Sequence, residues 1–469
     1  MLESSSSGAL VDRLRTELGS LAPGARLPSS RALVDRHRVS PVTVSRALAE
    51  LSAEGLVITR PGAGTFKAEP PARSAPVDHS WQTAVLADHE ISIRGLSFGV
   101  PEHDESLISL STGYLHPALM PIRALANAGA RAARRPGVWN LPPASGLIGL
   151  RTWVARAFGA AVEPRDVTIT PGGQGALSSV LRAIVPAGEP MLVESPTYMG
   201  AIAVLRAAGI RPVPVPIDAD GIVPELLAAA FQRTRARAVL VQPTYQNPTG
   251  AVLAPERRAE VLRIAQEAGA FIVEDDYARW LGHSDHVPPP LLHDDTEGRV
   301  IHLSAVTKVT SANLRIGAVI ARGPVIERVR ALRLVTDLLV PRLVQETALE
   351  FVSGPGWTRH LNWLHGELAA RCAQFAANLA TLLPGVHVAL RPRGGLHLWG
   401  RLPDHVDDAS AVDEARRAGV AVLPGRPFFP AEPPAPHLRL TFSAAASQAD
   451  LRTGLERLAT AVPVLSGAA

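Results

Sequence analysis

The sequence of 469 residues has a single cysteine, Cys372, which excludes an internal disulfide and any metal site built from several cysteines. It also lacks long apolar stretches, since none approaches the ~18 residues that a membrane-spanning helix needs. The first ten residues, MLESSSSGAL, have neither the basic start nor the apolar core of a secretory signal. We therefore expect a cytoplasmic protein without a membrane partner.

Lysine is nearly missing as well. Of the 47 basic residues, Lys67 and Lys308 are lysines and the remaining 45 are arginines. An arginine serves where only charge is needed, but its guanidinium stays protonated and cannot act as a nucleophile as an amine can. Lys308 is therefore a candidate for covalent chemistry, and the alternative is an ordinary surface lysine.

The overall composition indicates two or three domains with substantial cores. A chain of 469 residues is longer than one ordinary domain, and 46% hydrophobic against 19% charged residues can bury a core. The formal net charge of +4 is small, so it argues neither for nor against a nucleic-acid partner.

Residues 8–68 have the pattern of a small separate unit. Apolar residues recur at helical spacing in 8–20, and a second short helix is expected over 30–38. Ser40 and Pro41 suit the N-cap and first position of a third helix. Two short strands around a glycine-rich tip follow, so this region predicts three helices and a hairpin, which is a winged helix-turn-helix.

The charge of this unit suits a surface that faces phosphates. Seven basic residues stand against three acidic ones between Arg26 and Lys67. The alternative is a small helical domain with solvated arginines. Lys67 itself is expected at the edge of the hairpin, as a phosphate contact or as an ordinary surface lysine.

The motifs LPSSRAL, VSPVTVSRALAELSAEGLV and RPGAGTF resemble the GntR-type winged-helix domain over residues 8–68. The resemblance implies a third helix in the major groove of double-stranded DNA and a hairpin tip in the minor groove. Pro41 and Ser45 stand at positions where that family often has arginine. The residues that the resemblance places near DNA are Arg31, Thr43, Ser45, Arg46, Gly62 and Gly64.

Residues 69–105 are expected to be a linker, because residues 69–80 are rich in Pro, Ala and Ser and have no periodicity. From 106 to 469, short apolar strands alternate with helical stretches, which predicts a mainly parallel sheet with helices on both faces. Ligands of such sheets bind at the carboxyl ends of the strands. The predicted strands include 166–170, 190–195, 238–243, 271–276 and 300–305.

The residues that follow these strands point to one cofactor. A glycine-rich turn at 171–175 leads into a helix whose free N–H groups can hold a phosphate. Three of the four tyrosines of the chain also follow strands, and Asp275 and Lys308 do so too. Pyridoxal 5′-phosphate needs an amine, a carboxylate for its ring nitrogen, anion-binding groups and hydrogen-bond donors, so these residues together predict a site for it.

Residues 106–469 resemble the fold-type I aminotransferases in the order of their motifs. These are PGGQGAL, SPTY, NPTG, EDDY, a lysine with an arginine seven residues on, GGLHL and HLRLTFS. The resemblance implies an α/β/α sandwich of about residues 150–355 and a smaller α+β part of about 356–469. Ala305 departs from the family, which has a phosphate-binding serine there. The implied roles are Lys308 as the Schiff-base lysine, Asp275 at the pyridine nitrogen, Tyr277 and Asn247 at the phenolate oxygen, Tyr198 on the ring, Gly173, Gln174, Ser304, Thr307 and Arg315 around the phosphate, and Arg439 at a substrate carboxylate.

The two resemblances together are typical of the MocR group of GntR regulators. They imply a homodimeric transcription factor that binds operator DNA and senses pyridoxal phosphate, or an amine or amino acid that reacts with it. One alternative is a working aminotransferase that carries a helix-turn-helix domain. Another, suggested by Ala305, is a DNA-binding protein that has lost the cofactor.

Overall fold

The computed structural model describes residues 6–69, 78–86, 106–159, 162–284 and 287–467. Two compact units make up the chain, Met1–Glu90 and Ile91–Ala469. Within the region expected to be a linker, Ser80–Leu86 forms the short helix α4, and residues 70–77 and 87–105 lie outside the described residues.

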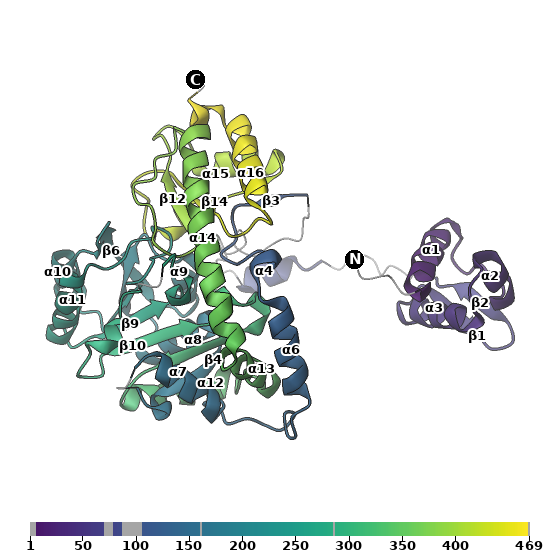
Figure 1. Ribbon diagram of the computed structural model, residues 1–469, viewed down its shortest axis with the longest axis horizontal. Coiled ribbons are helices and arrows are strands. Elements are labelled where there is room, and N and C mark those ends of the chain that lie inside the picture. Colours follow the sequence, from purple (N-terminus) through teal and green to yellow (C-terminus); the bar gives the residue numbers. More distant parts are fainter. Residues whose placement is uncertain (1–5, 70–77, 87–105, 160–161, 285–286, 468–469) are drawn as a thin grey trace. The chain divides into compact units, whose positions relative to one another are not determined.

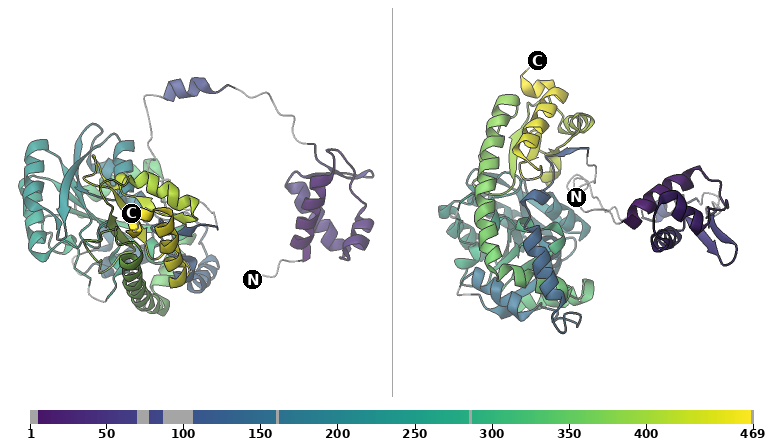
Figure 2. Two further views of the ribbon diagram at one scale, coloured as in Figure 1. Left: turned by 90° about the horizontal axis from the view of Figure 1, so that it is seen from above. Right: turned by 45° about the vertical axis from the view of Figure 1, so that its right-hand side comes forward.

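The N-terminal unit consists of three helices and a two-stranded antiparallel hairpin, as its sequence predicts (Figure 2). Ser40 is the N-cap of the third helix, and its hydroxyl accepts a hydrogen bond from the backbone N–H of Thr43 at 3.1 Å. Gly55, just after this helix, has a φ of +71°, which favours glycine. The elements are α1 (Ser6–Ser20), α2 (Ser30–His37), α3 (Pro41–Ala53), β1 (Val57–Arg60) and β2 (Gly64–Lys67).

One apolar cluster holds this unit together. Helices α1, α2 and α3 and strand β1 contribute buried side chains at helical spacing, so the apolar faces seen in the sequence meet in one core. The members include Leu10, Leu14, Leu18, Leu33, Val44, Leu48, Leu51 and Val57.

The second unit is built on an eight-stranded mixed sheet in the order β4-β11-β10-β9-β8-β5-β6-β7 (Figure 1). The five central strands from β10 to β6 run parallel, and β4, β11 and β7 pair antiparallel at the two ends. The strands are β4 (Val167–Pro171), β5 (Pro190–Ser195), β6 (Arg211–Asp218), β7 (Gly221–Ile222), β8 (Ala238–Val241), β9 (Phe271–Asp276), β10 (Val300–Ala305) and β11 (Ile316–Ile320).

Helices cover both faces of this sheet. Along β5, Leu192 joins one apolar cluster, whereas Met191 and Val193 join a second one, because successive side chains of a strand point to opposite faces. The second cluster contains α8 (Gly172–Ile184), α9 (Met199–Ala207) and α12 (Pro324–Thr336). The first contains α7 (Ile148–Ala157), α10 (Pro224–Thr234), α11 (Pro255–Glu267) and α13 (Arg342–Val352), and α6 (Ile122–Ala133) packs against α13.

A smaller C-terminal part is joined to the sheet by the long helix α14 (Pro355–Leu382), which runs between the two parts in Figure 1. Its three-stranded antiparallel sheet has the order β12-β15-β14. The elements are β12 (His397–Arg401), α15 (Asp408–Arg417), β13 (Val420–Ala421), β14 (Leu423–Pro424), β15 (His437–Thr441) and α16 (Gln448–Ala461), and β13 pairs with β3 (Ile108–Ser109). Among the helices of the described residues, none combines the length and apolarity that a membrane crossing needs.

Candidate functional site

A cavity of about 1050 Å³ opens at the carboxyl ends of the parallel strands, where the sequence predicts a ligand. Ser304 is not among its lining residues, because it is buried within β10 and its neighbour Ala305 lines the wall instead. The placement of Ser304 therefore does not support a role in phosphate binding. The predicted residues that line the cavity are Gly173, Gln174, Tyr198, Asn247, Asp275, Tyr277, Thr307, Lys308, Arg315 and Arg439.

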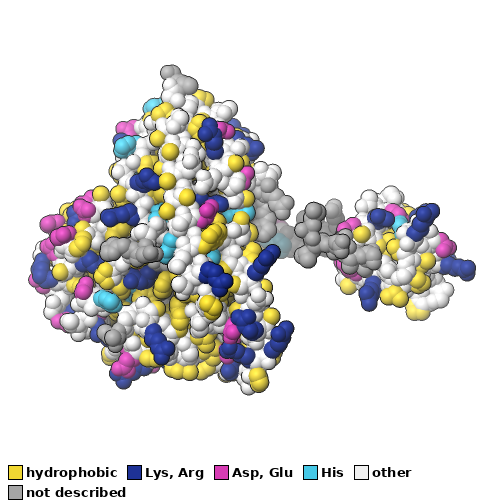
Figure 3. Space-filling model, viewed as in Figure 1, with side chains coloured by type: hydrophobic (Ala, Val, Ile, Leu, Met, Phe, Trp, Pro, Cys, Tyr) yellow, Lys and Arg dark blue, Asp and Glu magenta, His cyan; other side chains and the backbone are white. Residues whose placement is uncertain are grey.

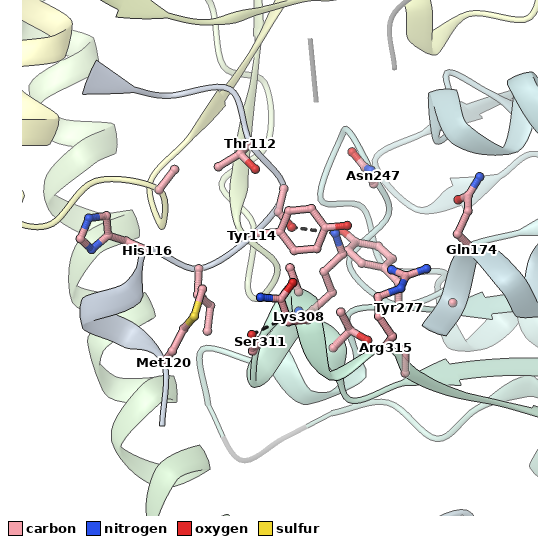
Figure 4. A pocket seen from close by; sticks show the side chains of 18 of the residues that line it. Thr112, Tyr114, His116, Met120, Gln174, Asn247, Tyr277, Lys308, Ser311 and Arg315 are labelled. Carbon is pink, nitrogen blue, oxygen red and sulfur yellow. Dashed lines mark hydrogen bonds between the residues drawn. The ribbon is translucent and has the colours of Figure 1, made fainter. Parts of the chain in front are cut away.

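Lys308 projects into this cavity from a short 3-10 helix, η5 (Thr307–Val309), just after β10 (Figure 4). Its Nζ donates a hydrogen bond to the carbonyl oxygen of Gly113 at 2.7 Å and lies 3.7 Å from the ring centre of Tyr114. Burial, aided by the positive charge of Arg439, lowers the pKa of Lys308 to about 7. About half of the amine is therefore neutral at pH 7, which makes it a nucleophile.

Asp275 faces the same cavity from the end of β9. Burial raises the pKa of Asp275 to about 6, while a hydrogen bond from Gln242 Nε2 to its Oδ2 at 2.7 Å opposes that rise. The carboxylate is therefore mostly ionised at neutral pH and can hold a proton on a ring nitrogen.

Gln242 is a site residue that the sequence analysis missed. Besides Asp275, it contacts Asn247, whose backbone N–H donates to Gln242 Oε1 at 3.1 Å. Its own backbone N–H donates to the buried carboxyl group of Glu194 at 3.2 Å, and burial raises the pKa of Glu194 to about 8. The predicted strand 238–243 includes Gln242, whereas β8 ends at Val241, so the prediction missed the place of Gln242 at the strand end.

An anion site lies where β4 meets α8. Arg315 Nη2 donates to the carbonyl oxygen of Pro171 at 2.8 Å, which holds the guanidinium against the first turn of α8. Gly172 has a φ of +78°, and a Cβ there would lie 3.0 Å from the guanidinium carbon of Arg315. The free N–H groups of this helix start and the arginine together can bind a phosphate.

Two tyrosines line the same cavity as Asp275 and Arg315. Tyr198 donates its hydroxyl hydrogen to Gln174 Oε1 at 3.2 Å, and Tyr277 donates to the backbone oxygen of Tyr245 at 2.9 Å. Burial raises the pKa of Tyr198 and of Tyr277, so both phenols stay neutral.

Arg439 reaches the cavity from β15 of the C-terminal part and is buried. Its Nη1 donates to Asn247 Oδ1 at 3.2 Å and its Nη2 to the backbone oxygen of Ser111 at 2.6 Å. Its Nε, like Thr112 Oγ1, has no hydrogen-bond partner among the described residues. Burial lowers the pKa of Arg439 to about 10, so the side chain keeps its charge at pH 7 and can bind a carboxylate.

The segment from 109 to 126 supplies cavity residues that the strand-end rule could not find. Thr112, Tyr114 and His116 line the cavity, and Tyr114 is the fourth tyrosine of the chain. His397 of β12 also lines it, and its Nδ1 lies 2.9 Å from Thr441 Oγ1. Burial and the charge of Arg439 lower the pKa of His397 well below its ordinary value, so the ring is neutral.

A buried polar cluster lies on the strands next to the cavity. Glu274, Asp276 and His302 are close enough to share a metal ion. However, Arg279 donates to Asp276 at 3.1 Å, and the backbone N–H of Leu291 donates to Glu274 at 2.8 Å. Arginine and backbone amides thus already pair with these carboxylates, and the cluster ties β9 to β10.

The N-terminal unit presents most of its predicted DNA-binding residues to solvent. Arg31, Ser45, Arg46 and Gly62 are exposed, while Thr43 and Gly64 are half-buried, and basic side chains project from this unit in Figure 3. Thr43 Oγ1 lies 2.8 Å from Ser40 Oγ, so its hydroxyl takes part in the cap of α3.

Lys67 is half-buried, and its Nζ donates to the backbone oxygen of Leu21 at 2.5 Å. The amine therefore links the hairpin to the end of α1 within the unit.

Two family models match the chain. Aminotransferase class I and II matches residues 105–458, and the gntR family of bacterial regulatory proteins matches residues 7–66. The HTH-type transcriptional regulator TauR of Rhodobacter capsulatus is 30% identical over 480 residues, which cover 97% of each chain.

The second unit is similar to aminotransferases in sequence and in structure. The 2-aminoadipate transaminase of Thermus thermophilus is 30% identical over 361 residues, which cover 76% of this chain and 90% of that protein. Among solved structures, α-aminoadipate aminotransferase LysN of Thermus thermophilus, complexed with N-(5′-phosphopyridoxyl)-L-leucine, has a TM-score of 0.74 and 28% identity. The match covers 83% of this chain and all of LysN.

Proposed function

Because the chain belongs to the class I and II aminotransferase family and carries a gntR-family domain, as MocR-type regulators do, we propose that this DNA-binding regulator senses pyridoxal 5′-phosphate, or an amine or amino acid that reacts with it. Residues 8–68 would bind operator DNA, residues 106–469 would bind the effector, and residues 69–105 would connect them.

The observation that carries this proposal is the set of charged groups that line the same cavity as Lys308. In a chain with two lysines, the one outside the DNA-binding unit lies in a cavity that also holds Asp275, Arg315 and Arg439. An amine with a pKa of about 7, a carboxylate, an anion site and a buried arginine are the groups that pyridoxal phosphate and an amino acid require. The residues present therefore fit the cofactor.

Each residue would have a separate task. When bound, pyridoxal phosphate supplies an aldehyde that condenses with amines and a ring that accepts electrons. Lys308 would hold it through its amine, Asp275 would hold a proton on the ring nitrogen, and Arg315 with the start of α8 would bind the phosphate. Ala305 adds no hydroxyl there, but Thr307 also lines the cavity.

The link to DNA would be a shift between two states of the protein. A ligand moves such a balance only by its differential affinity for the two states. Arg439 joins the C-terminal part to Ser111 and Asn247, so a carboxylate that takes over its hydrogen bonds would change how that part sits on the main sheet.

We also propose a homodimer. Large apolar side chains of the second unit are exposed, among them Trp139 at 78%, Leu141 at 78% and Val335 at 85%. A second copy that covers them would remove this surface from water. Analytical ultracentrifugation tests this: a sedimentation mass near twice 49.6 kDa is expected, and a strict monomer would contradict it.

Cofactor binding is tested by equilibrium dialysis against pyridoxal phosphate. Wild-type protein and a Lys67→Arg variant should each retain one cofactor per chain, whereas Lys308→Arg should lose the covalently held fraction, since arginine is not nucleophilic. Equal retention by Lys67→Arg and Lys308→Arg would contradict the assignment of Lys308.

A working aminotransferase is the second candidate, favoured by Lys308, Asp275 and Arg439 lying in one cavity and by the similarity to the Thermus transaminase. Multiple-turnover kinetics with panels of amino acids and keto acids separates the two. Sustained conversion favours the enzyme, and a single stoichiometric reaction without turnover favours the regulator.

A further inference from the structure

The cavity extends well beyond the groups that would hold a cofactor. Its volume of about 1050 Å³ is at the upper end of ligand pockets, which hold a drug-sized molecule in ~300–1,000 Å³. In Figure 4, Gln174 and Arg315 lie on one side of Lys308, and His116 and Met120 lie on the other. There is therefore room for a second small molecule on the side of Met120.

The wall on that side is apolar. It is formed by the segment that leads into α6 and by the first turns of α6, and the polar side chain there is His116. The apolar lining residues of this segment are Leu115, Met120, Ile122, Leu125 and Ala126.

This apolar wall has no charge to offer a ligand. The charged side chains that line the described cavity are Asp275, Lys308, Arg315 and Arg439, and each has a task in the proposed function. Burial, with the charge of Arg371, lowers the pKa of His116, and its Nδ1 already accepts from the backbone N–H of Ala118 at 3.1 Å. A charged group placed here would find no opposite charge among the described residues of this apolar wall.

At Arg439, in contrast, the cavity offers a positive charge to a ligand. Its Nε is a buried donor without a partner among the described residues, and Arg439 lines the cavity, so a ligand carboxylate can pair with its guanidinium. The position after Tyr198 is Met199, so no second arginine follows there for another carboxylate.

From these contacts we infer that the effector is an α-amino acid with an uncharged, apolar side chain, which packs against Leu115, Met120 and Leu125 while its carboxylate binds Arg439. This inference rests on the proposed function, because it places the amino group at Lys308 and the cofactor.

The selectivity can be measured by calorimetric titration of the cofactor-loaded protein with L-leucine, L-alanine, L-glutamate and L-lysine. Burial of the larger side chain should make L-leucine bind about 10- to 100-fold more tightly than L-alanine. L-Glutamate and L-lysine should bind no more tightly than L-alanine. 3-Methylbutylamine, which is L-leucine without its carboxylate, should bind at least about tenfold more weakly than L-leucine.

Two variants on α6 locate the side-chain site. Ala126 lines the cavity and is exposed, whereas Ala130, one turn further along, is exposed and does not line it. Ala126→Arg should raise the affinity for L-glutamate relative to L-leucine, and Ala130→Arg should leave that ratio unchanged. The same change in both variants would overturn the placement.

The outcomes also separate this inference from the proposed function. Uptake of cofactor together with binding of L-glutamate or L-lysine as tight as that of L-leucine would overturn the inference alone. Failure to take up pyridoxal phosphate at all would overturn both.

Discussion

The reactivity of Lys308 should follow a pKa near 7, and the near absence of lysine makes this directly measurable. A Lys67→Arg variant has Lys308 as its one lysine, so every acetylated lysine comes from that position. Lys67 lies in the other unit and its amine donates to Leu21, a contact that arginine can also make. The perturbation is a change of pH in the protein without cofactor.

The magnitude follows from the burial of the amine. With a pKa of about 7, its neutral fraction rises about eightfold from about pH 6 to pH 7.5 and less than about 1.5-fold from there to about pH 9. An amine with the ordinary pKa of 10.5 would instead gain about thirtyfold over that second interval.

The assay is brief labelling with acetic anhydride, read by mass spectrometry at Lys308, with the N-terminal amine as the internal reference. The account expects labelling to reach a plateau above about pH 7.5. A rate that keeps rising steeply to about pH 9 would refute a buried, desolvated amine and, with it, the cavity as the site of covalent chemistry.

Three further predictions concern the cofactor, the DNA and the core. Asp275→Asn should weaken pyridoxal phosphate binding about 10- to 100-fold in a fluorescence titration, because the ring nitrogen loses a charged partner; unchanged affinity would contradict the role of Asp275. Arg46→Ala should weaken binding to all DNA sequences and reduce the salt slope by about 1, whereas Arg452→Ala on α16 should not; equal effects would contradict the DNA surface. Leu51→Ala should lower the free energy of unfolding of the N-terminal unit by about 2–5 kcal/mol in denaturant titrations, because Leu51 is fully buried; a change below about 0.5 kcal/mol would contradict its core position.

Much of the fold could be predicted because its strands are short apolar runs with polar or turn residues after them. The predicted strands 190–195, 271–276 and 300–305 match β5, β9 and β10 to the residue. Strand β6 is harder to recognise, since RPVPVPID contains three prolines. These alternate, so their missing N–H groups lie on one side of the strand, and β6 keeps its pairing with β5.

The site residues at strand ends could be predicted from the sequence. Those that reach the site from distant parts of the chain could not. Asp275 lies at the carboxyl end of β9 and Lys308 comes three residues after the neighbouring parallel strand β10, so their proximity could be inferred from topology. Gly113 and Ser111 approach Lys308 and Arg439 through contacts that span 195 and 328 residues of sequence. No local periodicity encodes such contacts, and the apolar wall that follows them was missed for the same reason.

The central claim is that cofactor chemistry at Lys308 controls DNA binding, and fluorescence anisotropy with the DNA upstream of the gene tests it most directly. Wild-type and Lys308→Arg proteins are titrated with and without pyridoxal phosphate. The account predicts that the cofactor changes the dissociation constant for DNA in the wild type and leaves that of Lys308→Arg unchanged. An equal change in both proteins, or none in the wild type, would contradict it.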